Sequence, residues 1–262
     1  MSSEDLQPKV ASTFKILCGN IWGLWWPFSR HKRRRFARVG DRIQQEGHDV
    51  IFLQEVWRNS RRIPIHPCVR TASLEGGDSG LAMGTPGVEV IRTSDHHFST
   101  QQGLERIKRK GWMEAEIRGS GGHPMLLVNT HFQAQHHGFS SRRSQVLELL
   151  DHLEDQRLPI LIGGDLNLHA RYDGDRELEA LFERHGFVDT FLQHGLLEPT
   201  FTHRNPYLIL PRRDRLDRFY VREGEAGSLR MVEGRVLGPE IGTFSDHQFI
   251  EATFEFSHPT TR

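Results

Sequence analysis

Short apolar runs in this chain repeatedly end on an amide, a carboxylate or an imidazole. The runs are Phe14–Asn20, Asp49–Glu55, Pro124–His131 and Pro159–Asp165. Continuous apolar character over so few residues is typical of β-strands that are covered on both faces. The pattern therefore predicts a sheet whose strands deliver polar side chains to one edge.

Stretches with helical periodicity separate these runs. Apolar residues recur at spacings of three and four in Ser29–Gln45 and Arg142–Glu154, and Leu178–His185 is a shorter predicted helix. Ser29 is a suitable N-cap for the first helix. Further strands are expected at Leu81–Met83, Val88–Ile91, Trp112–Ile117, Asp217–Val221 and Gln248–Phe256. The alternation of strands and helices predicts an α/β fold with two packed sheets and helices outside them.

Length and composition are consistent with one globular domain. A hydrophobic content of 36% supplies a core, and no internal repeat or low-complexity linker divides the 262 residues. We expect a flexible arm at residues 1–11 and a single domain at residues 12–258 in a monomeric protein. Lys plus Arg and Asp plus Glu both number 34, so the chain lacks the basic excess of a general polyanion binder. This balance disfavours nonspecific nucleic-acid binding but does not exclude a nuclease, which needs only local positive charge.

Other sequence features bear on the compartment. The 2 cysteines give neither a disulfide framework nor a zinc-binding spacing. The N-terminus is polar, without an apolar signal core, and no apolar stretch approaches the roughly 20 residues needed to cross a bilayer. We therefore expect a cytoplasmic protein without a transmembrane segment, which can still bind peripherally at a membrane.

The polar residues at the strand ends suit the metal-assisted cleavage of a phosphodiester. A phosphodiester anion repels nucleophiles, so such an enzyme offsets the charge with Mg²⁺ and activates water with a fixed base. Mg²⁺ prefers oxygen ligands, and Glu55 suits that task because it directly follows an apolar run. The alternative for Glu55 is an ordinary surface glutamate, but such residues seldom close an apolar run.

Asp165 and Asn167 form the sharpest local motif, in the segment Gly-Gly-Asp-Leu-Asn. In an extended segment, residues two apart face the same way, so this carboxylate and this amide can converge on one water or one phosphate oxygen. The alternative is a Gly-Gly-Asp turn with ordinary side-chain capping.

His247 is the best candidate for a general acid or base, because imidazole titrates near neutrality and a carboxylate can orient it. Asp217 and Asp246 are candidates to share that work, one holding the ring and the other touching metal. His131 follows an apolar run and can donate a hydrogen bond to a phosphate oxygen, although it can equally be a satisfied histidine at a strand end. The chain has 16 histidines, so one alone is weak support. We expect four of them to be solvated loop residues: His96, His97, His136 and His137.

Together these motifs resemble the endonuclease/exonuclease/phosphatase superfamily, and the resemblance spans nearly the whole domain. The ordered set is Asn20, Gln54-Glu55, Thr130-His131, Gly164-Asp165-Leu166-Asn167, Arg215-Leu216-Asp217 and Ser245-Asp246-His247. The resemblance implies a four-layer α/β sandwich, with two mostly antiparallel sheets and a divalent-metal site at one end.

The resemblance also implies roles for individual residues. It makes Glu55 the main Mg²⁺ ligand, with Asn20 nearby and Asp246 as a metal or water contact, and Mn²⁺ as an alternative ion. It further implies that His131 binds phosphate, that Asp165 and Asn167 position water or phosphate, and that Asp217 orients His247. Whether Asp165 or His247 removes the proton from water stays open.

Within the superfamily the N-terminal region resembles the neutral sphingomyelinases. The similar segments are Asn20-Ile-Trp-Gly23 with the basic helix after it, Val39-Gly40-Asp41, Gln54-Glu55-Val56-Trp57, Ser79-Gly80-Leu81 and Thr130-His131-Phe132-Gln133-Ala134. The likeness fades after about Asn167, and the chain lacks the membrane spans that some of those enzymes carry. It implies a phospholipid of the sphingomyelin type as the substrate.

Two neighbouring segments are candidates for contact with lipid. Trp25 and Trp26 lie in an unusually apolar stretch, and tryptophan prefers a bilayer interface. The basic residues from Arg30 to Arg35 can meet lipid phosphates. The alternative is that the aromatic side chains pack under the first helix while the charges form a solvated face. Lys110 lies in a second basic cluster, which either touches substrate phosphate or is simply exposed.

The main alternative is a nuclease or an apurinic-site endonuclease acting on DNA or RNA. There the basic cluster would contact the nucleic-acid backbone, and Trp25 or Trp26 would stack on a base. A phosphatase of soluble phosphate esters is a third interpretation. A non-catalytic binding scaffold of the same fold is disfavoured, because every expected polar position is filled. The sequence thus predicts a Mg²⁺-dependent phosphodiesterase, with phospholipid ahead of nucleic acid as its substrate.

Overall fold

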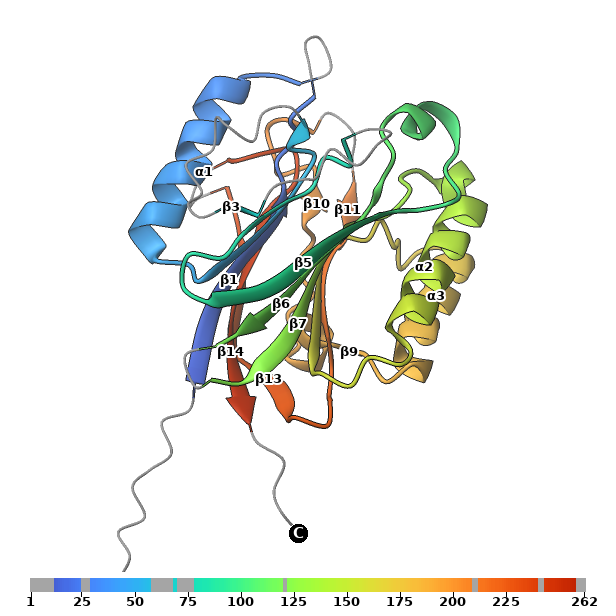
Figure 1. The fold of residues 1–262 in the computed structure, drawn as a ribbon. Coiled ribbons are helices and arrows are strands. Elements are labelled where there is room, and N and C mark those ends of the chain that lie inside the picture. The colour runs from blue at the N-terminus through green and yellow to red at the C-terminus, as the bar shows by residue number, and fades with distance from the viewer. Residues whose placement is uncertain are drawn as a thin grey trace, which may run out of the picture.

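The protein is an α/β sandwich, as predicted. The computed structural model describes residues 12–24, 29–57, 68–69, 78–119, 122–208, 212–239 and 243–257. Within these ranges two six-stranded mixed sheets pack face to face, with helices on their outer sides (Figure 1). The expected arm at residues 1–11 and the tryptophans Trp25 and Trp26 lie outside the described residues.

The first sheet contains both terminal strands of the described fold. Its strands lie in the order β13 (Ser228–Leu237), β14 (Phe249–Ser257), β1 (Ser12–Asn20), β2 (Val50–Gln54), β4 (Ala82–Gly84) and β3 (Cys68–Val69). Strands β1 and β2 are parallel, and the other neighbours pair antiparallel.

The second sheet is built in the same way around one parallel pair in the described residues, β7 with β8. Its order is β5 (Glu89–His97), β6 (Gly111–Arg118), β7 (Pro124–His131), β8 (Ile160–Asp165), β12 (Asp217–Arg222) and β9 (Val188–Asp189). A short separate ladder joins β10 (Phe201–Thr202) to β11 (Arg213–Asp214).

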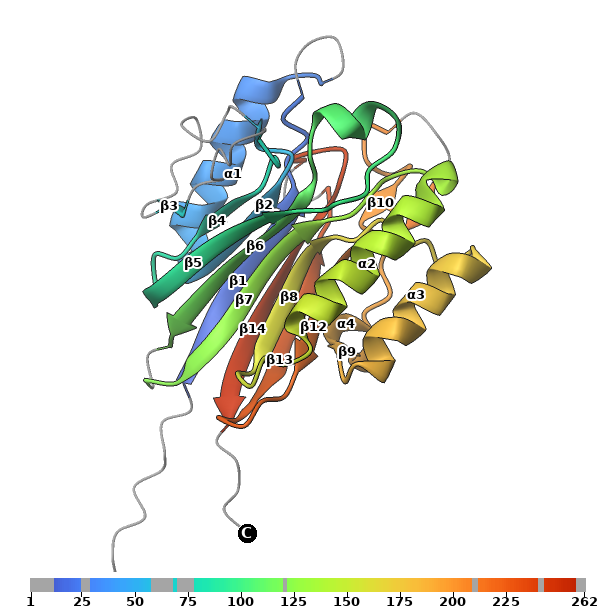
Figure 2. The same cartoon turned by 45° about the vertical axis from the view of Figure 1, so that its right-hand side comes forward.

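Helices cover the two outer faces. Helix α1 (Lys32–Glu46) lies on the first sheet, whereas α2 (Phe139–Leu153) and α3 (Asp173–Arg184) lie on the second (Figures 1 and 2). The shorter elements are α4 (Thr190–Gln193) and the 3-10 turns η2 (Gly103–Ile107) and η3 (His136–Gly138).

Alternation along the strands produces three apolar layers. In β1, Ile16 and Cys18 point into the core between the sheets, and Leu17 points toward α1. Because side chains alternate between the faces of a strand, a continuous apolar run supplies both layers at once. In the same way β8 contributes Leu161 to the central core and Ile162 to the layer under α2 and α3.

The registers bring the polar strand ends to one edge, as the sequence predicts. Asn20 pairs with Gln54 across β1 and β2, and His131 pairs with Asp165 across β7 and β8. Antiparallel β12 begins where β8 ends, so Asp217 lies opposite Asp165.

Three local expectations were wrong. His31, not Ser29, is the residue before α1, and Ser29 Oγ instead donates to the carbonyl of Trp22 at 2.8 Å. Helix α3 begins at Asp173, before the expected start, because Asp173 and Asp175 place negative charge in its first turn. His96 and His97 lie in β5 rather than in a loop.

Candidate active site

A cavity of about 500 Å³ lies at the polar edge of the two sheets. Most of its central side chains come from the end of a strand or from the residues that follow one, whereas Asp246 and His247 lie just before β14. The predicted site residues in its lining are Asn20, Glu55, His131, Asp165, Asn167, Asp246 and His247. The structure therefore brings together residues that are up to 227 positions apart in the chain, from Asn20 to His247.

Asp165 is the central hydrogen-bond acceptor of the cavity. Its Oδ2 accepts from Asn20 Nδ2 at 3.1 Å and lies 3.3 Å from His131 Nε2, while its Oδ1 accepts from the backbone N–H of Asn167 at 3.2 Å. Burial opposes ionisation, but the imidazoles of His247 and His131 and the ammonium of Lys110 lower the pKa of Asp165 below its usual range. Asp165 is therefore a carboxylate at neutral pH.

His247 is held by Asp217. The His247 Nδ1 lies 2.8 Å from Asp217 Oδ2, and its Nε2 points toward Asp165 Oδ2 at 3.7 Å. Burial alone would lower the pKa of His247, but the carboxylates of Asp217, Asp165 and Asp246 raise it to about 10. Burial raises the pKa of Asp217, although its contact with His247 opposes that shift. The His247 ring is thus positively charged at neutral pH and presents Nε2 to the cavity.

Glu55 and Asp246 form an acidic pair at the other side of the cavity. Glu55 Oε1 accepts from Asn20 Nδ2 at 3.1 Å, whereas the buried Oε2 has no hydrogen-bond partner among the described residues. Burial raises the pKa of Asp246 to about 6, because the nearby charge of Glu55 adds to the effect of burial while His247 opposes it. An unpaired buried carboxylate oxygen beside a second acid is costly unless a cation is present. These two oxygen donors fit a divalent ion such as Mg²⁺, which commonly takes one or two carboxylates plus waters.

Asn20 positions its neighbours. Its amide group donates to both Glu55 and Asp165, and its Oδ1 accepts from the backbone N–H of Trp22 at 2.9 Å. The sequence predicted Asn20 near the metal, and the structure places it as a bridge between the acidic pair and Asp165.

The backbone around Glu55 is unusual. Glu55 has a φ of 55°, in the left-handed region, and its carbonyl accepts from the N–H of Gly23 at 2.8 Å. A Cβ at position 23 would lie 2.2 Å from that carbonyl oxygen, so only glycine allows the approach. Backbone strain of this kind is concentrated at functional sites.

Lys110 lies behind His131 rather than on the cavity wall. The Lys110 Nζ is 2.9 Å from His131 Nε2, donates to the carbonyl of Phe132 at 2.7 Å and pairs with Glu105 at 3.1 Å. Only 2% of Lys110 is exposed, so it is neither the surface lysine nor the direct phosphate contact that the sequence suggested. It contributes buried positive charge beside His131 and Asp165.

Asn167 reaches the cavity by a different route from the one predicted. It does not continue an extended strand but has a φ of 52°, and its Nδ2 donates to the carbonyl of Phe132 at 3.1 Å. The convergence of Asp165 and Asn167 therefore arises from a tight turn after β8, not from strand alternation.

The rim of the cavity contains residues that the sequence did not single out as a site. His136 and His137 are exposed, as expected, but they line the cavity together with His169, Tyr172, Phe201, Arg212 and Leu216. The ring of Phe201 packs against His247 with centroids 4.9 Å apart. These residues come from loops, from the turn η3 and from the two-residue strand β10, none of which has a strand-end pattern that a single sequence reveals.

Arg35 is a second feature that the sequence did not show. It belongs to the basic cluster but is fully buried, and its guanidinium donates to the carbonyls of Ile21 at 2.6 Å and Phe244 at 3.1 Å. It thereby joins the loop after Asn20 to the loop before Asp246. Arg30, by contrast, is exposed, lies outside the cavity lining and contributes its carbonyl to Arg35 at 2.8 Å.

Comparisons with known proteins find similar sequences. The profile of the Endonuclease/Exonuclease/phosphatase family matches residues 18–247. The human protein Sphingomyelin phosphodiesterase 2 is 24% identical over 209 residues, which are 72% of this chain and 48% of that protein. The chain thus spans about half the length of this curated relative.

Solved structures share the fold. A crystal structure of D. rerio TDP2 complexed with single-strand DNA product superposes with a TM-score of 0.76 at 20% identity, covering 93% of this chain and 99% of that one. The structure of SmcL gives a TM-score of 0.72 at 19% identity with the same coverage. TDP2 from C. elegans gives 0.68 at 22% identity, covering 97% and 77%. No helix in the described ranges has the length and apolar character needed to span a membrane.

Proposed function

The chain belongs to the endonuclease/exonuclease/phosphatase family, and on that premise we propose that it is a divalent-metal-dependent phosphodiesterase acting on a sphingomyelin-like phospholipid. The family supports a metal-dependent phosphodiesterase or nuclease. The observation that most supports hydrolysis in this chain is the pairing, in one cavity, of an ionised Asp165 with a charged His247. One group can accept a proton and the other can donate a hydrogen bond within the same small space.

Asp165 is the proposed acceptor of the proton from the attacking water. Its pKa is lowered, so it is ionised, and the Asn20 amide and the Asn167 N–H fix its orientation. Positioning of this kind lowers the entropic cost of bringing water and base together.

His247 is the proposed donor to the phosphate. Its Nδ1 is committed to Asp217, which leaves Nε2–H free to donate to a phosphate oxygen as negative charge develops there. The raised pKa keeps the ring charged, which makes it a better electrostatic partner than a proton acceptor at neutral pH. We propose this division of labour for the question that the sequence left open.

Glu55 and Asp246 would hold the divalent ion, because they supply the unpaired carboxylate oxygen and the nearby second acid. When bound, Mg²⁺ or Mn²⁺ offsets negative charge on the reacting phosphate. His131, backed by the buried charge of Lys110, is the proposed contact to a second phosphate oxygen. We further propose that residues 12–258 form one catalytic domain.

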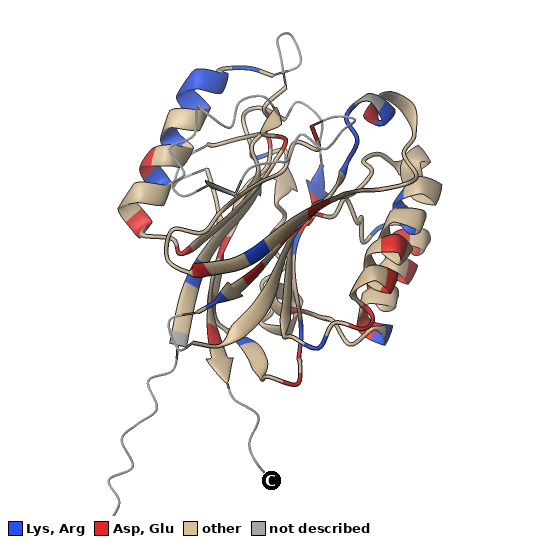
Figure 3. Cartoon of the chain, viewed as in Figure 1, with Lys and Arg blue, Asp and Glu red and all other residues tan. Residues whose placement is uncertain are grey.

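The lipid substrate is supported by the sequence similarity to a protein named Sphingomyelin phosphodiesterase 2. The start of α1 is rich in basic residues (Figure 3). Arg33 and Arg34 there are exposed, and in the sequence they follow Trp25 and Trp26 by a few positions. Basic and aromatic side chains so close in sequence suit contact with anionic head groups and a bilayer interface.

Nucleic acid is the second candidate. A structural neighbour with a TM-score of 0.76 was crystallised with single-strand DNA product, and the cavity rim here includes Arg212 with several histidines. Cationic groups beside the reacting phosphate can also bind the adjacent phosphates of a polynucleotide.

A paired assay tests the proposal. Purified protein with Mg²⁺ is incubated with sphingomyelin vesicles and, separately, with plasmid DNA and single-stranded DNA. Phosphocholine release that disappears in EDTA and in His247→Ala supports the lipid phosphodiesterase. DNA cleavage without phosphocholine release would reject the lipid substrate, and activity that survives both EDTA and His247→Ala would reject the catalytic assignment.

The role of the tryptophans has its own test. The double variant Trp25→Ala, Trp26→Ala should bind vesicles less well than the wild type, while its activity on a soluble chromogenic diester is unchanged. Equal losses on both substrates would mean that the two residues support the structure of the domain.

A further inference from the structure

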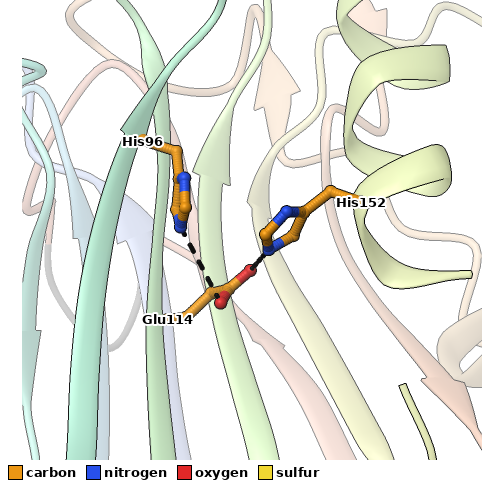
Figure 4. A group of neighbouring side chains, drawn as sticks. All are labelled: His96, Glu114 and His152. Carbon is orange, nitrogen blue, oxygen red and sulfur yellow. Dashed lines mark ion pairs between the residues drawn. The ribbon is translucent and has the colours of Figure 1, made fainter. Parts of the chain in front are cut away.

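A second group of potential metal ligands lies outside the cavity. It consists of His96 in β5, Glu114 in β6 and His152 in the last turn of α2, and Figure 4 shows the three side chains pointing toward one another. Each offers one ligand atom, and these atoms all lie within 4.8 Å of one another. None of the three belongs to the cavity lining.

The His96 imidazole is the unexplained part of this group. Its Nε2 is buried and has no hydrogen-bond partner within the described ranges, although it points at Glu114 Oε2 across 3.9 Å. That gap is too long for a hydrogen bond. In a tetrahedral site with metal–ligand bonds of about 2.0–2.2 Å, two ligand atoms lie about 3.3–3.6 Å apart, so a small side-chain rotation brings these two atoms to the spacing at which they share a metal ion.

The surrounding side chains hold the ligands in place. The His96 ring stacks on Trp112 with centroids 4.6 Å apart and planes 9° apart, which sets the direction of Nε2. Glu114 Oε1 accepts from Trp112 Nε1 at 2.9 Å, and Glu114 Oε2 accepts from Ser94 Oγ at 3.1 Å. Such supporting hydrogen bonds are a regular feature of metal sites, because they orient the ligands before the ion binds.

We propose that His96, Glu114 and His152 bind a divalent transition-metal ion, and that this ion is Zn²⁺. Two imidazoles and one carboxylate form a donor set that suits Zn²⁺, whereas Mg²⁺ prefers oxygen donors alone. His152 Nε2 lies 2.8 Å from Glu114 Oε1, and its side chain is 38% exposed, so solvent can complete the coordination. The site is thus chemically distinct from the acidic pair in the cavity.

The consequence of metal binding follows from the elements that it would join. The ion would link the C-terminal end of α2 to β5 and β6, across the layer between helix and sheet. A ligand that binds only the folded protein stabilises it by mass action. The inference therefore concerns stability and is independent of the proposed reaction.

Calorimetric titration of metal-free protein with Zn²⁺, in excess Mg²⁺, tests the site directly. Because Zn²⁺ can also enter the cavity, the comparison is between variants: His152→Gln should lose one equivalent of bound Zn²⁺, whereas Glu55→Gln should retain the equivalent at His152. His194→Gln is the matched control, since His194 is an exposed histidine at the end of α4, and it should titrate as the wild type does.

Thermal unfolding gives a second readout. At free Zn²⁺ about 100 times its Kd, the wild-type Tm should rise by about 5–10 °C, and this rise should be absent in His152→Gln. His152 is at the surface, so its replacement should leave the fold intact, which circular dichroism checks. The proposal is overturned if wild-type protein binds no Zn²⁺, or if His152→Gln binds as many equivalents with the same Tm rise; the His152–Glu114 contact is then an ordinary ion pair.

Discussion

Two of the regions that contain buried carboxylates differ in the partners of those groups. One region is the cavity; the other is the Glu251 cluster, which consists of Lys15, Arg42, Glu46, His48, Arg235 and Glu251 on the α1 side of the first sheet. In the cluster both oxygens of Glu251 meet cations. Oε1 accepts from Arg235 Nε at 2.9 Å, and Oε2 lies 2.7 Å from His48 Nε2 and accepts from Arg42 at 3.2 Å.

In the cavity the acids outnumber their direct cationic partners. Glu55 Oε2 and Asp217 Oδ1 have no hydrogen-bond partner in the part of the chain that the structure describes, and the pKa of Asp246 is raised to about 6 by burial and by Glu55. For Glu251, burial acts in the same direction, but hydrogen bonds from His48 and Arg235 reverse it and lower its pKa.

This difference in pairing distinguishes buried carboxylates that stabilise the fold from buried carboxylates that bind a ligand or take part in a reaction. A buried carboxylate with complete pairing resists protonation and contributes to stability. Acids that lack partners cost stability in the free protein and leave room for a cation or a phosphate. Substitutions of a carboxylate in the two regions should therefore have opposite effects on the free energy of unfolding and on activity.

The largest effect is expected for Glu55→Gln in the cavity. Loss of a proposed metal ligand should lower kcat/KM by about 10²–10⁴-fold, which corresponds to several kcal/mol of charge stabilisation. In EDTA the free energy of unfolding should stay constant or increase, because the change removes repulsion with Asp246. Urea unfolding measures the free energy of unfolding, and steady-state kinetics measure kcat/KM. A large loss of stability would contradict the expected difference between the cavity and the Glu251 cluster.

Glu251→Gln should show the opposite behaviour. It removes the charge that pairs with Arg235, Arg42 and His48, so the free energy of unfolding should fall by about 1–3 kcal/mol while kcat is unchanged. Glu255→Gln is the matched control, since Glu255 lies in the same strand but pairs with the exposed Arg230. The control should lose about 0.5 kcal/mol or less. Similar losses in both variants would show that the Glu251 cluster contributes no more to the free energy of unfolding than an exposed ion pair does.

The pH dependence of stability should follow Glu251 as well. Its pKa in the folded protein is depressed below the ordinary 4.5, so its contribution is fully present above pH 4.5 and is lost progressively as the pH falls from 4.5 toward the lower pKa of the folded protein. The stability difference between wild type and Glu251→Gln should therefore shrink by about 1 kcal/mol between pH 6 and pH 3.5. Urea titrations at several pH values measure it, and a constant difference would refute the assignment.

The sequence predicted the layers of the fold but not all of its strands. Runs such as Pro124–His131 were found because full burial makes them continuously apolar. Strand β13 was missed because a bulge between Met231 and Glu233 breaks the alternation that marks a half-exposed strand. Strand β5 was predicted too short, since its outer residues are polar and exposed.

The site shows the same limit. Asn20, Glu55, His131 and Asp165 were identifiable because an apolar run precedes each of them, whereas Asp217 and His247 were identified from their short motifs. The burial of Arg35 and Lys110 was not predictable, because it depends on carbonyls and side chains distant in the chain, and the sequence shows both residues only as members of basic clusters. The cavity-rim residue Arg212 comes from a loop and Phe201 from the two-residue strand β10, and neither segment is long enough to show a sequence pattern that predicts its position.

Phe201 provides the smallest of the expected effects. Its ring packs on His247, so Phe201→Leu should loosen the imidazole without changing the charge of the cavity, and kcat should fall by about 2–10-fold. Phe191→Leu is the control, because Phe191 is buried against Phe219 in the central core. That control should lower the free energy of unfolding by about 1 kcal/mol and leave kcat unchanged. If Phe201→Leu keeps full activity, Asp217 alone is sufficient to hold His247, and packing at the rim adds nothing to the positioning that buried charge provides.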